Sequence, residues 1–483
     1  MTVGRRTFLR AAGLGAVGAA AAACGATPPP ARQPSTSATS LPPSTSAKPS
    51  GPPDWEALRG KLSGELVLSD DGGFATAKRA FNPLFDGNKP VAVAKCTKPE
   101  DVQACVEAAG RRVPIAARSG GHSYAGYSAP DKGLVVDVGG MSQVDVHGDQ
   151  VVIGAGAQLG DVYSALATAG RCLPAGSCPT VGIAGLTLGG GIGVLTRKYG
   201  LTCDRLTSAQ LVTPDGQLRT ASADSESDLF WALRGGGGGN FGVVTSFTFE
   251  TVEAPTVTVF SLHFPAGSAG DVLDAWQRWL PGTPPELWSN IVLSGGSSVS
   301  CRVGGAFVGS SAQLTPLLAE LEATPSSRTR KTLSYGAAMD YFSGSSQRQT
   351  FVGSSRIITD PVDGGKVSDL AAGHQGMDLL IDGLGGAVGD VAPTDTAFWH
   401  RKALASIQVY APATSANQPS ARKSLSTVVS GLADAGAGGG YVNYIDPDLP
   451  DWKAAYYGDN AGRLDQLTRT LDPDGVFAFA QTA

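Results

Sequence analysis

The sequence is poor in the residues that build several common kinds of site. Its 483 residues include only five histidines and seven cysteines, and no two cysteines stand in a CxxC pair. Structural zinc sites need such closely spaced ligands, so we expect no structural metal. Basic residues number 37 against 42 acidic ones, and the two signs are mixed along the chain. Because no basic face is available to bind a phosphate backbone, we expect no nucleic-acid partner.

Long apolar runs are also missing, apart from a short one near the N-terminus. Residues 4–10 carry two adjacent arginines, and a weakly apolar Ala/Gly-rich run follows to Ala23, directly before Cys24. That run is too short for a good membrane span, and residues 1–24 resemble a twin-arginine export signal. A lipidated Cys24 would anchor the exported protein, although the usual leucine of a lipobox is absent. Lipidation and ordinary cleavage therefore stay alternatives.

The next segments suggest a linker and a first domain. Residues 25–53 are rich in Pro, Ser, Thr and Ala without apolar periodicity, which is typical of a solvated linker. Residues 54–255 alternate short apolar runs with helical patterns, which indicates a mixed α/β domain. The strands expected there are 90–94, 113–118, 134–138, 151–153 and 243–251, and the expected helices are 99–112 and 159–169.

Residues 256–430 are expected to form a separate substrate-covering domain. It contains predicted helices at 270–280 and 312–323 and a predicted strand at 406–410. We expect its scattered aromatic residues to fill a core, since large aromatics are usually buried; they are Trp276, Trp279, Trp288, Tyr335, Tyr341 and Trp399. The glycine-rich character returns in residues 431–483, which we expect to fold back on the first domain.

Three glycine-rich stretches of the first domain suggest a cofactor site. Residues 118–124 read Arg-Ser-Gly-Gly-His-Ser-Tyr, residues 176–193 carry one cysteine and no charge, and residues 235–239 are all glycine. Such backbone approaches an anion closely and can lie flat against a planar ligand. Together the three stretches favour an extended dinucleotide. A nicotinamide cofactor is disfavoured, because the glycines of residues 151–160 lack the GxGxxG spacing.

These motifs together resemble those of the berberine bridge enzyme-like FAD-linked oxidases, which have the vanillyl-alcohol oxidase fold. The likeness covers residues 81–251 and 441–481, where R-S-G-G-H-S, C-P-T-V-G and Y-V-N-Y-I-D occur in the family's order. The resemblance implies an α+β fold of the FAD-binding PCMH type with an α/β substrate-covering domain. It also implies bicovalent FAD, bonded by His122 at the flavin 8α-methyl carbon and by Cys178 at ring position 6.

The resemblance implies further cofactor contacts and an oxygen gate. Val181 occupies a position associated with oxygen access, where a small residue suggests an oxidase. Plant members have a histidine where this chain has Leu186, so another group must stabilise the reduced flavin here. The other implied cofactor contacts are Arg118, Ser119, Gly120, Gly121, Ser123, Gly182, Gly185, Gly189, Gly193, Gly242, Val243, Val244 and Asn443.

The same resemblance suggests catalytic residues. Tyr444 is the first choice for the base that takes a substrate hydroxyl proton, and Tyr441 is the second. A tyrosine with the usual pKa of about 10 is a poor base at neutral pH, so we expect a depressed pKa. Tyr124, in an H-x-Y spacing with the tethered histidine, is expected to contact the substrate. Gln408 is expected over the flavin, where an amide cannot act as a base.

The leading hypothesis is therefore an exported FAD-dependent oxidase. It would oxidise an alcohol or carbohydrate hydroxyl by hydride transfer to flavin and reduce O2 to H2O2, acting on a small-molecule substrate as a monomer. One alternative is an oxidative tailoring enzyme that closes a ring or desaturates a natural product. Another is a flavin dehydrogenase, or a surface-anchored flavoprotein, that passes electrons to an acceptor other than oxygen.

Overall fold

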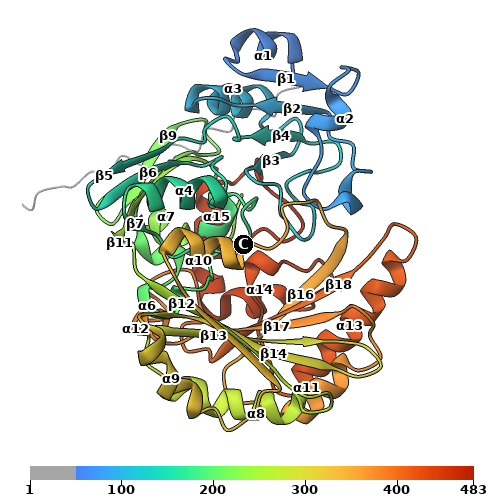
Figure 1. Ribbon diagram of the computed structural model, residues 1–483. Coiled ribbons are helices and arrows are strands. Elements are labelled where there is room, and N and C mark those ends of the chain that lie inside the picture. The colour runs from blue at the N-terminus through green and yellow to red at the C-terminus, as the bar shows by residue number, and fades with distance from the viewer. Residues whose placement is uncertain (1–50) are drawn as a thin grey trace, which may run out of the picture. The chain divides into compact units, whose positions relative to one another are not determined.

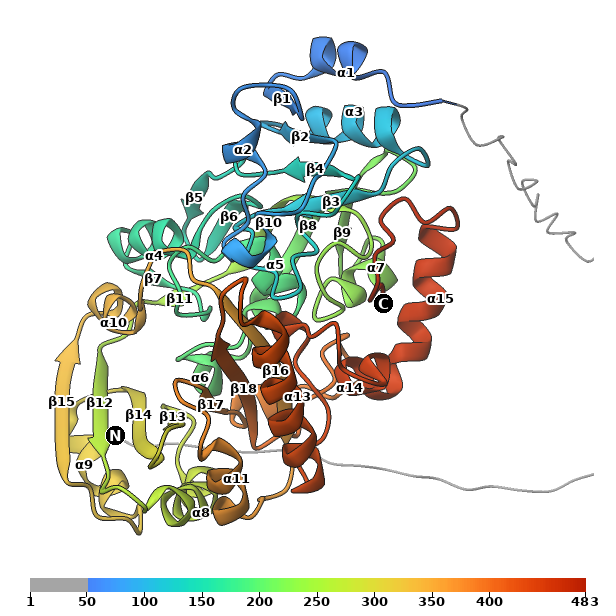
Figure 2. The same ribbon diagram turned by 90° about the vertical axis from the view of Figure 1, so that its right-hand side faces the viewer.

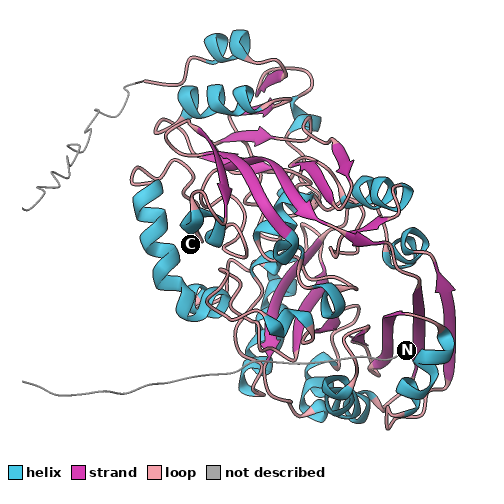
Figure 3. Ribbon diagram, turned by 90° about the vertical axis from the view of Figure 1, so that its left-hand side faces the viewer, coloured by secondary structure: helices cyan, strands magenta, loops and turns pink. Residues whose placement is uncertain are grey.

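The computed structural model describes residues 51–483. The predicted export signal, residues 1–24, and nearly all of the predicted linker, residues 25–53, lie outside these residues. No helix of the described part is long and apolar enough to cross a membrane. Three larger sheets organise it, and Figure 3 shows the strands of the first two gathered above those of the third, with loops and short helices between them.

The first sheet has four strands and carries the histidine loop at one edge. Its order is β1-β2-β4-β3, with β2 and β3 both parallel to β4, and α1 and α3 pack on it (Figure 1). The element bounds are α1 Trp55–Lys61, β1 Glu65–Leu68, α2 Phe74–Ala77, β2 Ala92–Lys95, α3 Pro99–Ala109, β3 Ile115–Arg118 and β4 Leu134–Asp137. The helix predicted to reach residue 112 ends at Ala109, because Arg111 adopts a left-handed conformation with a φ of 64°.

The second sheet has five antiparallel strands in the order β5-β6-β10-β8-β9. Its elements, together with the short helices and the small β7–β11 pair beside it, carry the other glycine loops. The bounds are β5 Val144–His147, β6 Gln150–Gly154, α4 Leu159–Thr168, β7 Arg171–Cys172, α5 Ile183–Leu188, α6 Thr196–Tyr199, β8 Leu206–Val212, β9 Leu218–Ser222, α7 Ser227–Ala232, β10 Val243–Glu250 and β11 Val252–Glu253.

The third sheet has seven antiparallel strands in the order β15-β12-β14-β13-β17-β18-β16. Helices α8, α9, α11 and α13 pack against it (Figure 1). The bounds are β12 Val257–His263, α8 Ala269–Trp279, β13 Leu287–Ser294, β14 Ser300–Val308, α9 Ser311–Ala319, β15 Ser327–Leu333, α10 Tyr335–Phe342, β16 Phe351–Ile358, α11 Gly364–Ala371, β17 Asp378–Gly383, α12 Ala387–Asp390, β18 Ala405–Pro412 and α13 Gln418–Asp434.

The last segment returns to the glycine loops. Helices α14 (Trp452–Tyr457) and α15 (Ala461–Leu471) follow α13, and α15 packs beside α7 (Figure 2). The Tyr457 hydroxyl donates to the Gly236 carbonyl, and the Ala483 N–H donates to the Asn240 side chain. These contacts join residues that are more than two hundred positions apart.

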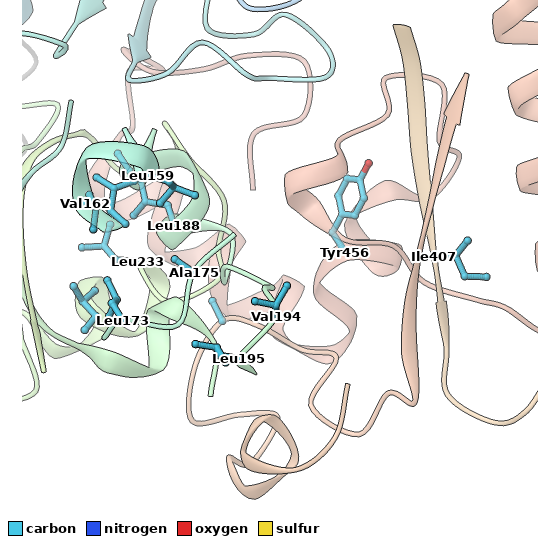
Figure 4. Close-up of a cluster of buried hydrophobic side chains, with 14 of the residues drawn as sticks. Leu159, Val162, Leu173, Ala175, Leu188, Val194, Leu195, Leu233, Ile407 and Tyr456 are labelled. Carbon is cyan, nitrogen blue, oxygen red and sulfur yellow. The ribbon is translucent and has the colours of Figure 1, made fainter. Parts of the chain in front are cut away.

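Apolar side chains form the floor under the second glycine loop. Leu159 and Val162 of α4 meet Leu188 at the end of α5 and Leu233 after α7, all of them buried (Figure 4). At roughly 25 cal/mol per Å² of apolar surface removed from water, each such leucine contributes about 1.5–3 kcal/mol. The loop therefore rests on a packed core, although its glycines provide almost no side-chain surface of their own.

The Arg118–Asp137 pair is expected to stabilise the first sheet. The two residues face each other across β3 and β4, and Arg118 is buried with two nitrogens on one Asp137 oxygen, 3.0 and 2.6 Å away. Arg118→Ala leaves that carboxylate without its partner, so we predict a loss of about 2–4 kcal/mol in the free energy of unfolding. Urea unfolding followed by circular dichroism measures this loss.

Arg59→Ala is the matched control, because it breaks exposed ion pairs with Glu56 and Asp71. We expect it to cost less than about 1 kcal/mol. Equal losses of unfolding free energy in the two variants would show that the buried pair stabilises the protein no more than an exposed one.

Candidate active site

The described part of the chain contains a cavity of about 720 Å³ between the glycine loops and the seven-stranded sheet. Residues 119–124 and most of residues 181–188 and 237–244 line one side of it, residues 441–445 line another, and strands β13, β14, β17 and β18 supply the facing wall. A cavity of this size and position can enclose a small ligand together with part of a larger one. The three glycine stretches predicted to meet a ligand do therefore border one space.

Two glycine loops cross at a point where neither can carry a side chain. A Cβ atom on Gly120 would lie 2.4 Å from the Gly182 nitrogen, and one on Gly182 would lie 2.1 Å from the Ser119 hydroxyl oxygen. Both distances are far below van der Waals contact. Close backbone approach therefore requires glycine at both positions, and it brings the loop after β3 against the loop that starts α5.

The crossing brings His122 and Cys178 together at Thr180. The His122 Nε2 atom lies 2.9 Å from the Thr180 hydroxyl oxygen, and the Cys178 sulfur lies 3.5 Å from the same oxygen. The His122 ring stacks on Phe81, with ring centroids 3.8 Å apart. One hydroxyl thus holds both predicted tether residues at the edge of the cavity. Sequence reasoning did not select Thr180, although this residue belongs to the C-P-T-V-G motif and follows Cys178 by two positions.

Burial keeps the His122 imidazole neutral. Desolvation lowers the pKa of His122 from 6.5 to about 4, and a hydrogen bond that the ring donates to the Thr180 backbone carbonyl only partly offsets this effect. The ring therefore has an available nitrogen lone pair throughout the physiological pH range. A neutral imidazole beside a thiol is a suitable pair of nucleophiles for an electron-poor ring.

Gly185, Gly238 and Gly239 form one wall of the cavity, called here the glycine wall, and they leave flat space that a side chain would fill. Cβ atoms on Gly185 and Gly239 would meet nothing within 4 Å, and one on Gly238 would meet only the Gly185 Cα atom. All three residues line the cavity. The buried hydroxyl of Ser128, also on the lining, has no hydrogen-bond partner in the described chain. This surface therefore fits a planar ring system with polar groups at one end.

The two tyrosines of the tail motif have different environments. The Tyr441 oxygen accepts hydrogen bonds from the Gly191 and Ile192 N–H groups, at 3.0 and 3.2 Å, and from the Asn443 amide at 2.8 Å. Tyr441 is 2% exposed, and burial raises its pKa to about 12. Its phenol therefore ties the tail to the second glycine loop, which leaves Tyr444 as the candidate for contact with a substrate.

Tyr444 presents a free hydroxyl to the cavity. Its ring stacks near Tyr124, with centroids 5.4 Å apart, and no described residue hydrogen-bonds its oxygen. Gln408 on β18 also lines the cavity, and its amide donates to the Tyr124 hydroxyl. Desolvation, followed by the charge of Asp382, raises the pKa of Tyr444 well above 10. The protein residues by themselves therefore raise this pKa, and the depression expected from the sequence would have to come from oxidised flavin or a neighbouring cation.

Models of two families match the chain. The FAD binding domain model matches residues 90–222, and the model described as berberine and berberine like matches residues 440–482. An uncharacterized FAD-linked oxidoreductase of Bacillus subtilis is 36% identical over 440 residues, which cover 87% of this chain and 97% of that protein. The chain belongs to the berberine bridge enzyme-like family of FAD-linked oxidoreductases. The fold predicted from the motifs is thereby confirmed.

Other members of the berberine bridge enzyme-like family are similar along nearly the whole described chain. The chitooligosaccharide oxidase of Gibberella zeae is 32% identical over 477 residues, covering 89% of this chain and 95% of that protein. The structure of BBE-like 1 from Physcomitrella patens superposes with a TM-score of 0.81 at 30% identity, covering 88% of this chain and 98% of the other.

Family membership makes FAD the cofactor, and the cavity agrees with it. The glycine residues of the lining leave open space that a planar ring such as isoalloxazine could occupy, and His122, Cys178 and Tyr444 line the same cavity. Most of the predicted cofactor residues line the cavity: Ser119, Gly120, Gly121, Ser123, Val181, Gly182, Gly185, Gly193, Gly242, Val243, Val244 and Asn443.

Two predicted cofactor residues do not line the cavity. The Arg118 guanidinium is occupied by Asp137 and by the Ala77 carbonyl, so it fixes the strand that leads into the histidine loop. Gly189 packs against Asn443, where a Cβ atom would lie 2.1 Å from the Asn443 amide oxygen. Both residues therefore hold the loops that form the site and do not border the cavity themselves.

The seven-stranded sheet adds polar residues that the sequence reasoning did not select. Asp378 and Asp382 lie on the cavity face of β17, and Asn290 and Arg302 lie on neighbouring strands. Burial raises the pKa of Asp382 to about 6. The Asn290 carbonyl oxygen has no hydrogen-bond partner in the described chain. Polar residues at alternate positions of an otherwise apolar strand, as in Asp378-Leu-Leu-Ile-Asp382, were the available signal.

The core assignment of the aromatic residues was correct only for some of them. Trp276, Trp279 and Tyr335 are buried in the core. Trp288 is buried as well, but it lines the cavity, and its indole N–H has no partner in the described residues. Tyr341 is exposed. The facing wall of the cavity therefore combines an aromatic ring with amide, guanidinium and carboxylate groups.

The two tail tyrosines should respond differently to loss of the hydroxyl. Tyr441→Phe leaves the Gly191 and Ile192 N–H groups unsatisfied, so we predict a loss of about 2–3 kcal/mol in the free energy of unfolding. Tyr444→Phe removes a hydroxyl without a protein partner and should cost less than about 0.5 kcal/mol. Urea unfolding of apoprotein carrying each change makes the comparison, and a larger loss for Tyr444→Phe would contradict the assignment.

Proposed function

We propose that this protein is an exported oxidase that takes a hydride from a carbon bearing a hydroxyl group, on a carbohydrate or related alcohol, and reduces O2 to H2O2. The unpartnered Tyr444 hydroxyl carries most weight, since it faces a glycine wall across a cavity that also contains Asp382. Bound FAD supplies the hydride acceptor. The similarity to a chitooligosaccharide oxidase and the polar facing wall favour a carbohydrate.

The alcohol proton needs an acceptor on the protein. Tyr444 by itself is a weak acid in this environment, because its pKa lies well above 10. Asp382, with a pKa of about 6, is ionised at neutral pH, and its negative charge helps to raise the pKa of Tyr444. We assign substrate contact to Tyr444 and final proton acceptance to Asp382. Gln408 holds the Tyr124 hydroxyl, so Tyr124 forms a fixed side of the substrate pocket.

Both His122 and Cys178 are proposed to bond the FAD covalently. Their support is the shared Thr180 hydroxyl, which holds the two nucleophilic atoms at one edge of the glycine wall. Positions 8α and 6 belong to the same end of the isoalloxazine ring, so one ring edge can meet both. Two tethers draw electron density from the ring and retain the cofactor in a wide cavity.

The proposed oxygen reactivity and location rest on other residues. Val181 lines the cavity three residues after Cys178, where a small side chain leaves room for O2. The twin arginines in residues 4–10 support export, and Cys24 followed by the polar linker supports a lipid anchor on the outer membrane face. We propose a monomer that meets its substrate outside the cytoplasm.

The tethers can be counted by acid denaturation. We predict that His122→Ala and Cys178→Ala each keep flavin bound to the denatured protein, whereas the double change releases it all. In Cys178→Ala apoprotein, attachment of added FAD should keep a constant rate from pH 8 to about pH 5, since His122 stays neutral down to about pH 4. Flavin absorbance of the precipitate measures both. Complete release from His122→Ala with Cys178 intact would disprove the double tether.

The proton acceptor should determine the pH dependence of flavin reduction. Because the pKa of Asp382 is raised to about 6, protonation below that pH removes the base, and the anaerobic reduction rate should fall about tenfold per pH unit. Asp382→Asn and Tyr444→Phe should each slow reduction about 10²–10⁴-fold. Stopped-flow absorbance with a chitooligosaccharide or related sugar is the measurement.

Asp378→Asn is the matched control, since Asp378 lies on the same face of the same strand. It should retain the pH dependence with an apparent pKa near 6. Loss of that dependence in Asp378→Asn alone would transfer the role to Asp378. Reduction by sugar without reoxidation by O2 would instead identify a dehydrogenase that uses another acceptor.

A further inference from the structure

Two cysteines outside the active site lie side by side where α3 meets the first sheet. Cys96 directly follows β2, and Cys105 lies in the middle of α3. Their sulfur atoms are 4.0 Å apart, and both side chains are fully buried. All six described cysteines are free thiols, and no other pair of sulfur atoms is in hydrogen-bond contact in residues 51–483.

The backbone around this pair is held firmly on both sides. The Cys96 N–H donates to the Asp137 carbonyl at 2.8 Å, which fixes it against β4. Asp101, in the first turn of α3, accepts hydrogen bonds from the N–H groups of Ser63 and Thr97, both at 2.8 Å. The short connection from Cys96 to α3 is therefore rigid. A disulfide needs a sulfur separation of about 2.05 Å, so the two sulfur atoms must move closer together than their present 4.0 Å.

We propose that Cys96 and Cys105 form a structural disulfide in the exported protein. This inference rests on the proposed export, because disulfides persist in oxidising compartments. The two thiols lose two protons and two electrons and gain one sulfur–sulfur bond. When local opening exposes the two buried thiols, a small disulfide oxidant of the extracytoplasmic space accepts the electrons and protons as its own sulfur–sulfur bond breaks into two thiols.

A metal-binding or catalytic role fits these thiols less well. No group of three His, Cys, Asp or Glu side chains in the described residues is placed to hold a metal ion. The nearby Asp137 carboxylate already binds Arg118, and Asp101 already accepts hydrogen bonds from Ser63 and Thr97. Neither cysteine lines the cavity. The pair is therefore available for a structural bond alone.

The bond would strengthen the frame behind the histidine loop. It joins α3 to β2, β2 pairs with β4, and β4 pairs with β3, whose last residue, Arg118, leads into the loop of His122. Closing a short loop stabilises a fold chiefly by restricting its unfolded chain. The disulfide thus adds to the stability of the sheet that positions one FAD ligand.

Thiol mapping tests the proposal on full-length holoenzyme. Protein collected from the exporting host is unfolded in guanidinium with iodoacetamide and no reductant, digested and analysed by mass spectrometry. We expect one cross-linked peptide pair containing Cys96 and Cys105, and alkylation at Cys172, Cys203 and Cys301. Alkylation of both Cys96 and Cys105 in exported protein would overturn the proposal.

A second experiment tests whether Cys96 and Cys105 can form a disulfide, independently of export and of enzyme activity. Holoenzyme purified in reduced form from cytoplasm is incubated with oxidised glutathione, and the same cross-link should form with loss of two hydrogen atoms in mass. This readout needs neither turnover nor covalent flavin. Failure to form the bond here would overturn the proposal even if the sugar oxidase activity is found.

Thermal unfolding gives the matched comparison. Dithiothreitol should lower the melting temperature of exported wild-type holoenzyme by about 3–5 °C and leave Cys96→Ser and Cys105→Ser unchanged. Cys301→Ser, which alters a buried cysteine without a sulfur neighbour, should keep the wild-type response. Equal responses of Cys96→Ser and Cys301→Ser to dithiothreitol would contradict the assignment.

Discussion

The backbone crossing of Gly120 and Gly182 is the constraint on which the site depends. Neither residue tolerates a Cβ atom, because each would enter the other loop's backbone or the Ser119 side chain. The crossing brings the loops of His122 and Cys178 together, and the Thr180 hydroxyl contacts both side chains. A site that must hold one ring edge at two points needs this kind of rigidity.

Tyr441, in the C-terminal segment, holds the second glycine loop in place. Its phenol accepts hydrogen bonds from two N–H groups of the second glycine loop and from Asn443, which in turn donates to the Leu186 carbonyl. The tail is thus bound to the second glycine loop, which borders the glycine wall of the cavity. This arrangement fixes the position of Tyr444 three residues later, with its hydroxyl left free for a ligand.

The sequence allowed much of this site to be predicted because its loops carry local signals. Glycine pairs after an apolar strand identified residues 118–124, and the tail motif identified Tyr444. The facing wall was different. Asp382 and Asn290 meet only because β13 pairs with β17, and these strands are separated by nearly ninety residues in sequence. The polar alternation in Asp378-Leu-Leu-Ile-Asp382 marks one face of its strand, but no local pattern links Asp382 to Asn290, so the register had to come from the structure.

Arg118 and Gly189 show a second limit of motif reasoning. Both stand inside motifs whose neighbours line the cavity, yet one binds Asp137 and the other packs against Asn443. A motif records every residue needed to build a loop, and it does not separate those that touch a ligand from those that support the loop. Burial and pairing in three dimensions make that distinction.

The return of the tail also sets an order of events in biosynthesis. The glycine loops are translated long before residues 441–483, which supply the phenol on Gly191 and Ile192 and the contacts to Gly236 and Asn240. A nascent chain still on the ribosome therefore holds an open, half-built FAD cradle. The complete lining of the cavity therefore forms only after the tail has been released and has folded back onto the glycine loops.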